Sequence, residues 1–330
     1  MIVARSPYRI SLFGGGTDIP EYFNKKGGIV ISTTINKYCY VTFKDLLKFY
    51  EHKYLISWSK LERKNSIFEI EHPTIKNILC YFNYTNGLEI HHTGDLPARS
   101  GMGSSSAFAV AIVHLFYHKL QIKSHDIKSE VAKLAFHIER NMNNEFVGMQ
   151  DQLASSYGGF NSIEFSSSDN KNIFKVNPIN IANDYLRYLE SGMVLLYLGT
   201  TRNASDIEFE KFKDKSSYES KLDEIKDIAH LGLNLILKES AIKDIGELLD
   251  NSWLIKKSLS SSVSNNKIDE FFVYAKKAGA LGSKLLGAGG GGFVLCLVEK
   301  SKRNDFIRKI KLLNIDFKFD FGGSQIINFN

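Results

Sequence analysis

A glycine- and serine-rich loop at residues 94–107 constrains the fold of this 330-residue chain more than any other segment. An alternating, strand-like stretch, Leu88–Thr93, precedes the loop, and an apolar, alanine-rich stretch with helical character, Ala107–Leu120, follows it. A strand that is followed by a flexible loop and then by the beginning of a helix presents free backbone N–H groups and the positive end of that helix to an anion. Gly101 and Gly103 allow the backbone to turn tightly and to approach a phosphate closely.

Three consecutive serines, Ser104, Ser105 and Ser106, stand where the helix is expected to begin. One hydroxyl there can cap the helix, and another can reach a metal ion or a phosphate oxygen. A capped helix after an ordinary turn explains the same residues, so the loop by itself leaves both interpretations open. The loop is not a P-loop, because no Gly-Lys-Ser/Thr follows at the required spacing.

The composition is that of a soluble globular protein with room for two domains. Hydrophobic residues make up 43% of the chain, and no apolar run reaches the roughly 18 residues that span a bilayer. The net charge of +6 is modest, and basic and acidic residues are interspersed, for example over 211–226, so we expect neither a nucleic-acid nor a membrane partner. Cys39, Cys80 and Cys296 are odd in number and widely spaced, and residues 1–7 lack a secretory pattern, so we expect a cytoplasmic protein.

Hydrophobic periodicity divides the chain into two α+β domains, residues 1–180 and 181–330, joined near 170–190. Strands are expected at Ile2–Ala4, Gly28–Thr34, Tyr38–Phe43, Tyr54–Ser57, Ser66–Ile70, Leu88–Thr93, Met193–Leu198, Phe293–Val298 and Phe317–Phe321. Helices are expected at Ala107–Leu120, Asp126–Arg140, Tyr218–Leu237, Ala241–Ser258, Ile268–Leu286 and Lys302–Leu313.

Two further glycine clusters lie near the ends of the chain. Gly14–Asp18 follows the segment Pro7–Phe13, and Gly287–Gly292 precedes the strand-like Phe293–Val298. Neither cluster is a dinucleotide-binding fingerprint, which needs a strand, a glycine loop and a helix in that order, whereas the second cluster is expected to lie between a helix and a strand. A single glycine cluster is most often a turn, but three of them together with an acidic pair favour a functional site.

The acidic pair is Glu139 and Asp151. Glu139 lies near the end of the amphipathic helix expected at 126–140, beside its apolar face, where a surface carboxylate near Arg140 is the simpler interpretation. Asp151 precedes Gln152 and can cap a helix that begins at that residue. Capping and catalysis are compatible, so both carboxylates stay functional candidates.

These clusters and the acidic pair together resemble the GHMP kinases, a superfamily of small-molecule kinases that includes galactokinase, homoserine kinase and mevalonate kinase. Pro97–Ala107 is similar to the family's Pro-x-x-x-Gly-Leu-Gly-Ser-Ser phosphate loop, with Met102 in place of the usual Leu. Pro7–Asp18 resembles the N-terminal motif and Gly287–Phe293 the C-terminal glycine motif, so the resemblance spans nearly the whole chain. It implies a two-domain α+β fold, with an N-terminal domain like ribosomal protein S5 domain 2, a ferredoxin-like C-terminal domain and an active site between them.

Within the superfamily, the sequence is similar to the bacterial D-glycero-D-manno-heptose 7-phosphate kinases. The features that carry this resemblance are Gly-Gly-Gly-Thr-Asp at 14–18, where galactokinases have a Gly-Glu-His-Thr-Asp type of sequence, the segment 27–38, and Arg202–Ser205. The resemblance implies an ATP-dependent kinase that phosphorylates the anomeric C1 hydroxyl of the heptose 7-phosphate, for GDP-heptose and surface polysaccharide synthesis. A kinase for fucose, galactose or a related hexose and a non-catalytic sensor of sugar and ATP are the alternatives, and a homodimer is one option for its assembly.

The resemblance also implies a role for individual residues. Asp151 is expected to accept the proton of the attacking hydroxyl, and Arg9 to face that carboxylate and stabilise charge on the transferring phosphoryl group. Ser105 and Glu139 resemble the ligands of Mg²⁺, a cation that prefers hard oxygen donors and uses few protein carboxylates. The residues expected to hold the triphosphate of ATP are Pro97, Arg99, Ser100, Gly101, Met102, Gly103, Ser104, Ser105 and Ser106. Those expected to contact the sugar phosphate are Gly16, Thr17, Asp18, Arg202, Gly289 and Gly290.

A substrate that already carries a distal phosphate needs a second anion site. The candidates are Arg202, Lys37, Arg99, Lys256 and Lys257, of which Arg202 ranks first for its motif-like place after a strand. Arg99 stands where relatives usually have a small residue. Each of these side chains is also explained as an ordinary surface charge, and a cavity with no basic group opposite the catalytic carboxylate would favour an unphosphorylated sugar.

Overall fold

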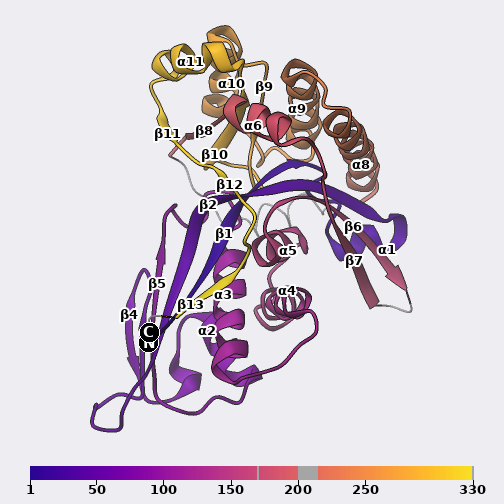
Figure 1. The fold of residues 1–330 in the computed structure, drawn as a ribbon. Helices are drawn as coiled ribbons and strands as arrows, with labels where there is room; N and C mark the ends of the chain where they lie inside the picture. The colour runs from indigo at the N-terminus through magenta and orange to yellow at the C-terminus, as the bar shows by residue number, and fades with distance from the viewer. Residues whose placement is uncertain (169–170, 200–214, 329–330) are drawn as a thin grey trace.

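The computed structural model describes residues 1–168, 171–199 and 215–328, and its strands form two sheets with helices packed against them (Figure 1). The larger sheet has nine strands, and the chain ends lie side by side in it because the last strand pairs antiparallel with the first. Its strands are β1 (Ile2–Phe13), β2 (Gly28–Asp45), β3 (Tyr54–Ser57), β4 (Leu61–Lys64), β5 (Leu88–Gly94), β6 (Phe160–Ser168), β7 (Lys171–Pro178), β12 (Phe319–Asp320) and β13 (Gln325–Asn328).

Strand β2 organises the larger sheet because its 18 residues pair with different neighbours along its length. Its first part, Gly28–Thr33, pairs with β6, and its last part, Cys39–Asp45, pairs with β5. Strand β1 runs antiparallel along the other edge, but its register shifts between Pro7 and Arg9 and again between Ser11 and Phe13. Such irregularities re-aim side chains, and here they lie in the part of β1 that reaches the functional site.

Helices cover one face of the larger sheet (Figure 1). The central helix, α3, packs against β1, β2, α4 and α5, and its residues 106–116 are buried apart from His114. A helix that is apolar on nearly every side is stable only when it is enclosed in this way. The helical segments of this part are α1 (Pro20–Lys26), the 3₁₀ turn η1 (Ile67–Glu69), α2 (Pro73–Tyr81), α3 (Ser104–Lys119), α4 (Ile127–His137), the π-helical turn η2 (Ile138–Met142) and α5 (Gln150–Tyr157).

The smaller sheet has the order β11-β8-β10-β9 with antiparallel pairing throughout. The chain passes through it as strand, helices, two strands, helix and strand, which is the ferredoxin-like arrangement expected from the sequence. Helix α8 also packs on β1 and β2 and so joins the two sheets. The elements are α6 (Asn183–Gly192), β8 (Met193–Tyr197), α8 (Lys215–Leu237), α9 (Ile242–Lys257), α10 (Asn266–Ala278), β9 (Gly282–Leu285), β10 (Phe293–Leu297), η3 (Lys300–Lys302), α11 (Arg303–Ile310) and β11 (Leu313–Ile315).

The strand expected at Ser66–Ile70 is wrong, because a local capping box turns this segment into the 3₁₀ turn η1. The Phe68 N–H donates to Ser66 Oγ at 3.3 Å, and the Ser66 N–H donates to a Glu69 carboxylate oxygen at 3.1 Å. A serine followed three residues later by a glutamate is a helix-start signal, and it overrides the strand propensity of the apolar residues between them.

The helix expected at Ile268–Leu286 is also wrong in its second half. Helix α10 ends at Ala278 because Gly279 adopts a left-handed conformation with φ 116°, and the chain then enters β9. A glycine of this kind is the usual signal for the end of a helix. The C-terminal glycine cluster therefore connects two strands, β9 and β10, and not a helix and a strand.

The division of the chain near residue 180 stays a prediction. The strand pairing refines it, because β12 pairs with β2 and β13 pairs with β1. The segment from Phe319 to Asn328 thus belongs to the larger sheet although it follows the smaller one in sequence.

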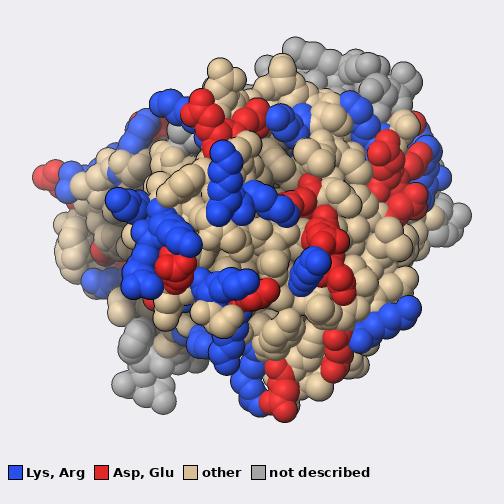
Figure 2. Space-filling model, turned by 90° about the horizontal axis from the view of Figure 1, so that it is seen from above, with Lys and Arg blue, Asp and Glu red and all other residues tan. Residues whose placement is uncertain are grey.

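The surface carries mixed charge. Seen from above, the face formed by the upper helices of Figure 1 shows Lys and Arg interspersed with Asp and Glu (Figure 2). Among the described residues, no helix is both long enough and apolar enough to cross a membrane. Cys39 and Cys296 are buried free thiols, whereas Cys80 is exposed.

Candidate active site

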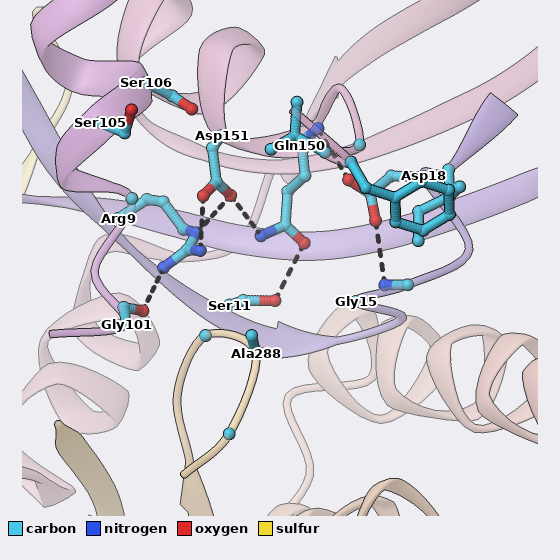
Figure 3. A pocket seen from close by; sticks show the side chains of 18 of the residues that line it. Arg9, Ser11, Gly15, Asp18, Gly101, Ser105, Ser106, Gln150, Asp151 and Ala288 are labelled. Atoms are coloured by element: carbon cyan, nitrogen blue, oxygen red, sulfur yellow. Dashed lines mark hydrogen bonds and ion pairs between the residues drawn. The ribbon is translucent and has the colours of Figure 1, made fainter. Parts of the chain in front are cut away.

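A cavity of about 430 Å³ lies where loops of the larger sheet meet the glycine-rich loop of the smaller sheet (Figure 3). Its walls come from β1 and the loop after it, the loop into α3, the turn η2, residues 145–148, the start of α5, and residues 287–289 and 291 between β9 and β10. Helices α8 and α9 contribute Tyr218 and Lys256. Segments far apart in sequence converge on one hollow, which is the arrangement of a small-molecule site.

The loop into α3 has the backbone conformation of an anion site. Gly101 and Gly103 have left-handed φ angles of 85° and 74°, and α3 begins directly afterwards at Ser104. Ser105 and Ser106 continue the first turn, and all three serines line the cavity. The positive end of a long buried helix and its unpaired N–H groups therefore face the cavity.

The glycine loop of the smaller sheet supports this phosphate loop by backbone contact. The Phe293 N–H donates to the Ser100 carbonyl oxygen at 3.0 Å. A Cβ atom on Gly101 would lie 2.5 Å from the Leu286 carbonyl oxygen, and one on Gly287 would lie 2.4 Å from the Gly101 Cα. Only residues without a side chain allow the two loops to approach this closely.

We expect Gly101→Ala to lower the free energy of unfolding by about 3 kcal/mol, since the new Cβ adds a backbone clash to an unfavourable φ. Gly279→Ala is the matched control, because Gly279 has a positive φ of 116°, but a Cβ atom on it would meet no atom within 4 Å. The control is expected to cost only about 1 kcal/mol of backbone strain. Urea unfolding of both variants measures the difference, and equal losses would contradict the proposed packing of the two loops.

Arg9 and Asp151 form an ion pair at the wall of the cavity. Nε and Nη2 of Arg9 each donate to a different Asp151 carboxylate oxygen at 2.8 Å, and Nη1 donates to the Gly101 carbonyl oxygen at 2.6 Å (Figure 3). Arg9 is 4% exposed, whereas the side chain of Asp151 is 26% exposed. The carboxylate is thus held in one orientation by a bidentate pair and keeps an open side for a ligand.

Asp151 does not cap its helix as the sequence suggested. Helix α5 begins at Gln150 and not at Gln152, so Asp151 lies in its first turn, where the helix dipole favours a negative charge. A chain of side-chain hydrogen bonds continues from it: Gln150 Nε2 donates to Asp151 Oδ1 at 3.2 Å, and Ser11 Oγ donates to Gln150 Oε1 at 2.9 Å (Figure 3). Both the carboxylate and its neighbouring amide are therefore fixed.

Asp18 brings a second, more deeply buried carboxylate to the cavity. Its oxygens accept from the Gly16 N–H at 2.9 Å and the Gln150 N–H at 3.0 Å. Burial raises the pKa of Asp18 to about 6, although these backbone donors act in the opposite direction. A Cβ on Gly148 would lie 2.0 Å from the carboxylate, so the glycine makes room for it.

Asp18→Asn is expected to change the pH dependence of stability. The folded-state pKa of about 6 exceeds the ordinary value of 3.8, so ionisation of Asp18 costs stability as the pH rises through this interval. Asn does not titrate, so the free energy of unfolding of the wild type, relative to the variant, should fall by up to about 3 kcal/mol between pH 4 and pH 7. Urea unfolding of both proteins across this pH range measures the difference in their free energies of unfolding. The contributions of titrating groups that both proteins share cancel in this difference. A difference that does not depend on pH would refute the raised pKa of Asp18.

Glu139 is fully buried on η2, the π-helical turn that follows α4, so the interpretation as a surface carboxylate is wrong. Ser105 Oγ donates to one of its carboxylate oxygens and Gln152 Nε2 to the other, each at 2.7 Å. Burial raises the pKa of Glu139 to about 7, and the nearby Glu145 carboxylate adds to this effect. π-Helical turns often occur at functional sites, and this one directs a carboxylate into the cavity.

The donor set at Glu139 fits a magnesium ion. The carboxylate and the Ser105 hydroxyl are hard oxygen donors that line the cavity beside the phosphate loop. The side chains that hydrogen-bond to Glu139, those of Ser105, Gln152 and Ser106, are uncharged, so a cation would offset the cost of burying its charge. The described part of the chain has no cluster of three or more His, Cys, Asp or Glu suited to a metal, and Mg²⁺ with bound phosphates needs fewer protein carboxylates than that.

Comparison with known proteins identifies the family. The GHMP kinases N terminal domain matches residues 70–159, and the GHMP kinases C terminal domain matches residues 235–314. The D-glycero-alpha-D-manno-heptose 7-phosphate kinase of Campylobacter jejuni is 32% identical over 326 residues, which cover 94% of this chain and 93% of that protein. This chain is a GHMP kinase. It is therefore a small-molecule kinase, and members of this family use ATP as the phosphate donor.

Solved structures of other GHMP kinases have the same architecture. A D-glycero-D-manno-heptose 1-phosphate kinase from Bacteriodes thetaiotaomicron has a TM-score of 0.79 at 24% identity, with 100% of both chains covered. The galactokinase of Lactococcus lactis, solved with galactose, has a TM-score of 0.74 at 17% identity, with 99% of this chain and 94% of that one covered. These similarities confirm the two-domain α+β fold expected from the sequence.

Most residues predicted for the site line the cavity of this GHMP kinase, but several do not. Those that line it are Arg9, Gly16, Asp18, Arg99, Gly101, Gly103, Ser104, Ser105, Ser106, Glu139, Asp151 and Gly289. Those that do not line it are Thr17, Pro97, Ser100, Met102 and Gly290. Arg202 lies outside the described residues. The binding role of each residue stays a prediction.

The residues behind the cavity wall hold the backbone of the loops. Thr17 is fully buried, and its Oγ1 lies 2.9 Å from the Ile29 carbonyl oxygen. Ser100 is fully buried, and its Oγ donates to the Pro97 carbonyl oxygen at 2.6 Å. Met102 is likewise enclosed in the core. These side chains shape the GHMP kinase site from outside the cavity.

Several polar residues that line the cavity of the GHMP kinase were not predicted from the sequence, among them Glu145, Gln150 and Lys284. Gln150 adjoins the predicted Asp151, so its place in the site could have been inferred from that assignment. Lys284 is a charged residue in a short apolar stretch just before the third glycine cluster, which is a weak signal for a buried functional group. No sequence pattern singles out Glu145.

Proposed function

We propose that this GHMP kinase is a sugar kinase that transfers the γ-phosphoryl group of ATP to the anomeric C1 hydroxyl of D-glycero-D-manno-heptose 7-phosphate. The products are the 1,7-bisphosphate, a precursor for GDP-heptose and surface polysaccharide, and ADP. The observation that carries the proposal is the Arg9–Asp151 pair, whose carboxylate opens into a cavity beside the N-terminus of α3. The choice of heptose rests on the similarity to the Campylobacter jejuni heptose 7-phosphate kinase.

In the proposed reaction, Asp151 accepts the proton of the C1 hydroxyl while the hydroxyl oxygen attacks the γ-phosphorus. The bond from that phosphorus to the oxygen that bridges it to the β-phosphorus breaks, and ADP leaves. An anomeric hydroxyl is more acidic than an ordinary alcohol, so a carboxylate is a suitable base. Arg9 orients this base through both oxygens and places a positive charge where the transition state becomes more negative.

The remaining cavity residues bind the two substrates in this proposal. Gly101 and Gly103, with the serines at the start of α3, hold the phosphates of ATP through backbone N–H groups and hydroxyls. Ser105 and Glu139 hold Mg²⁺, which when bound supplies positive charge to the phosphates. Asp18, which reaches the cavity from the loop after β1, accepts hydrogen bonds from sugar hydroxyls.

Of the five basic residues considered for the distal phosphate, Arg99 and Lys256 line the cavity. Lys257 is paired with Asp269 at 2.7 Å, and Lys37 is not part of the cavity lining. Arg202 lies outside the described residues. Because Arg99 belongs to the loop proposed for ATP, Lys256 on α9 is, among the described candidates, the one that we propose for the distal phosphate. Lys256 Nζ also donates to the carbonyl oxygens of Leu285 at 2.9 Å and Gly287, in the loop that packs on Gly101. Lys256→Met should therefore raise KM for the phosphorylated sugar at least about tenfold and by a larger factor than KM for ATP.

The experiment that tests the function is ADP release from MgATP across a sugar panel, with Asp151→Asn as the control. The panel contains D-glycero-D-manno-heptose 7-phosphate, the heptose 1-phosphate, mannose, fucose and galactose. Turnover on the 7-phosphate alone, lost in the variant, is the expected result. Turnover on a neutral sugar would support the kinase activity and refute the distal phosphate site. Absence of turnover on every sugar, with ATP still bound, would favour a non-catalytic sensor.

A further inference from the structure

Lys284 is a buried ammonium group to which the proposed reaction assigns no role. It lies on β9 of the smaller sheet, is 4% exposed and lines the cavity. Its Nζ donates to the carbonyl oxygens of Leu12 at 2.6 Å and Ser11 at 3.4 Å, near the end of β1. A side chain of the smaller sheet thus binds the backbone of the larger sheet at the wall of the active site.

This position is costly for a lysine. Burial lowers the pKa of Lys284 to about 7, and the positive charge of Arg9 acts in the same direction. The two acceptors are neutral carbonyl oxygens, which offset the desolvation of an ammonium less well than a carboxylate would. The strand partner of Lys284 on β10 is Leu295, so a long apolar side chain would suit the surroundings. The two hydrogen bonds of Lys284 therefore offset only part of the cost of burying its ammonium group.

The backbone that Lys284 binds is one that the sheet itself leaves irregular. The register of β1 against β2 shifts between Ser11 and Phe13, so the strand ladder does not fix this segment completely. The Ser11 side chain in turn donates to Gln150 Oε1 at 2.9 Å, and Gln150 Nε2 donates to Asp151 Oδ1 at 3.2 Å. A continuous set of contacts therefore leads from Lys284 to the carboxylate.

We propose that Lys284 is a positioning residue: by holding the backbone of Ser11 and Leu12, it keeps the Ser11–Gln150 hydrogen bond in place and so orients the Asp151 carboxylate for proton transfer. The inference rests on the proposed role of Asp151 as the base. It makes the contact between the two sheets a condition for efficient turnover, because the lysine lies on β9 of the smaller sheet and the carboxylate lies on α5, which packs on β1 and β2 of the larger sheet.

The test compares Lys284→Met, Lys284→Arg, Ser11→Ala and the double variant Lys284→Met with Ser11→Ala. Lys284→Met should lower kcat at least about tenfold and change KM for ATP less than about twofold, whereas Lys284→Arg, which restores the donors, should recover most of the loss. Ser11→Ala alone should lower kcat by a similar factor. Both residues act through the same series of hydrogen bonds to Asp151. The double variant should therefore be no more than about twofold slower than the slower single variant. Lys257→Met, at an ion pair of α9 outside the cavity lining, is the charge-removal control.

Wild-type kcat in Lys284→Met, or single losses that multiply in the double variant, would overturn the inference. If Lys284→Met does not fold, Ser11→Ala still tests the inference. Wild-type kcat in Ser11→Ala would refute the hydrogen-bonded path from Lys284 to Asp151. If the wild-type enzyme is inactive on every sugar, the proposed function is refuted. The positioning role of Lys284 is then tested by a crystal structure of Lys284→Met. Loss of the Ser11–Gln150 hydrogen bond is expected there, and its retention would overturn the inference.

Discussion

Asp151→Asn is expected to lower kcat by about 1000-fold, within the range of about 100- to 10,000-fold that general acid–base catalysis contributes. The substitution keeps the size of the side chain and removes both the proton acceptor and the negative charge that faces Arg9. One amide oxygen still accepts from the guanidinium, and the Arg9–Gly101 hydrogen bond at 2.6 Å does not involve the substituted group. The phosphate loop should therefore keep its shape, and ATP affinity should change less than about threefold.

Single-turnover ADP release and calorimetric titration with an ATP analogue separate the two effects. Asp305→Asn, which removes a carboxylate paired with Lys309 on α11, is the matched control and should turn over like the wild type. Turnover within about tenfold of the wild type in Asp151→Asn would be too small a loss for the base and would remove that role. Loss of ATP binding together with turnover would instead show that the carboxylate organises the phosphate loop.

The phosphate loop could be predicted from the sequence because its conformation is local. Gly101 and Gly103 adopt the left-handed angles that glycine favours, and the helix begins within the serine run, at Ser104. Glu139 needed the family resemblance, because the helical pattern alone fits a surface position equally well. The π-helical turn that buries this carboxylate has no clear sequence signature.

The contacts that complete the site join residues that are remote in sequence, and local patterns do not report them. Lys284 binds the carbonyl oxygen of Leu12 across a separation of 272 residues, and Ser11 binds Gln150 across 139. The helix expected through residue 286 also hid Lys284, because it placed this lysine on a helix and not on a strand facing the other sheet. Gly279, a helix-end signal with φ 116°, was the residue that could have corrected this boundary.

Glu139→Gln is expected to raise the Mg²⁺ concentration for half-maximal activity at least about tenfold, because a carboxylate is a far better ligand than an amide for this hard cation. The free protein should be at least as stable as the wild type. Burial raises the pKa of Glu139 to about 7, so a neutral group of the same shape removes an unfavourable charge. Gln152 Oε1 is buried and, within the described structure, has no hydrogen-bond partner, so a rotated Gln152 amide can accept from the new side chain.

The two readouts together separate a metal ligand from a structural carboxylate. A structural role predicts lower stability with an unchanged Mg²⁺ titration, whereas the ligand role predicts the reverse. Glu145→Gln is the matched control: its carboxylate also lines the cavity, but it accepts from Asn143 Nδ2 at 3.1 Å, and the Mg²⁺ requirement should change less than about threefold. Mn²⁺ binding to the protein with a non-hydrolysable ATP analogue, followed by electron paramagnetic resonance, measures the affinity without turnover. Unchanged Mn²⁺ affinity in Glu139→Gln would remove the residue from the metal site whatever its effect on activity.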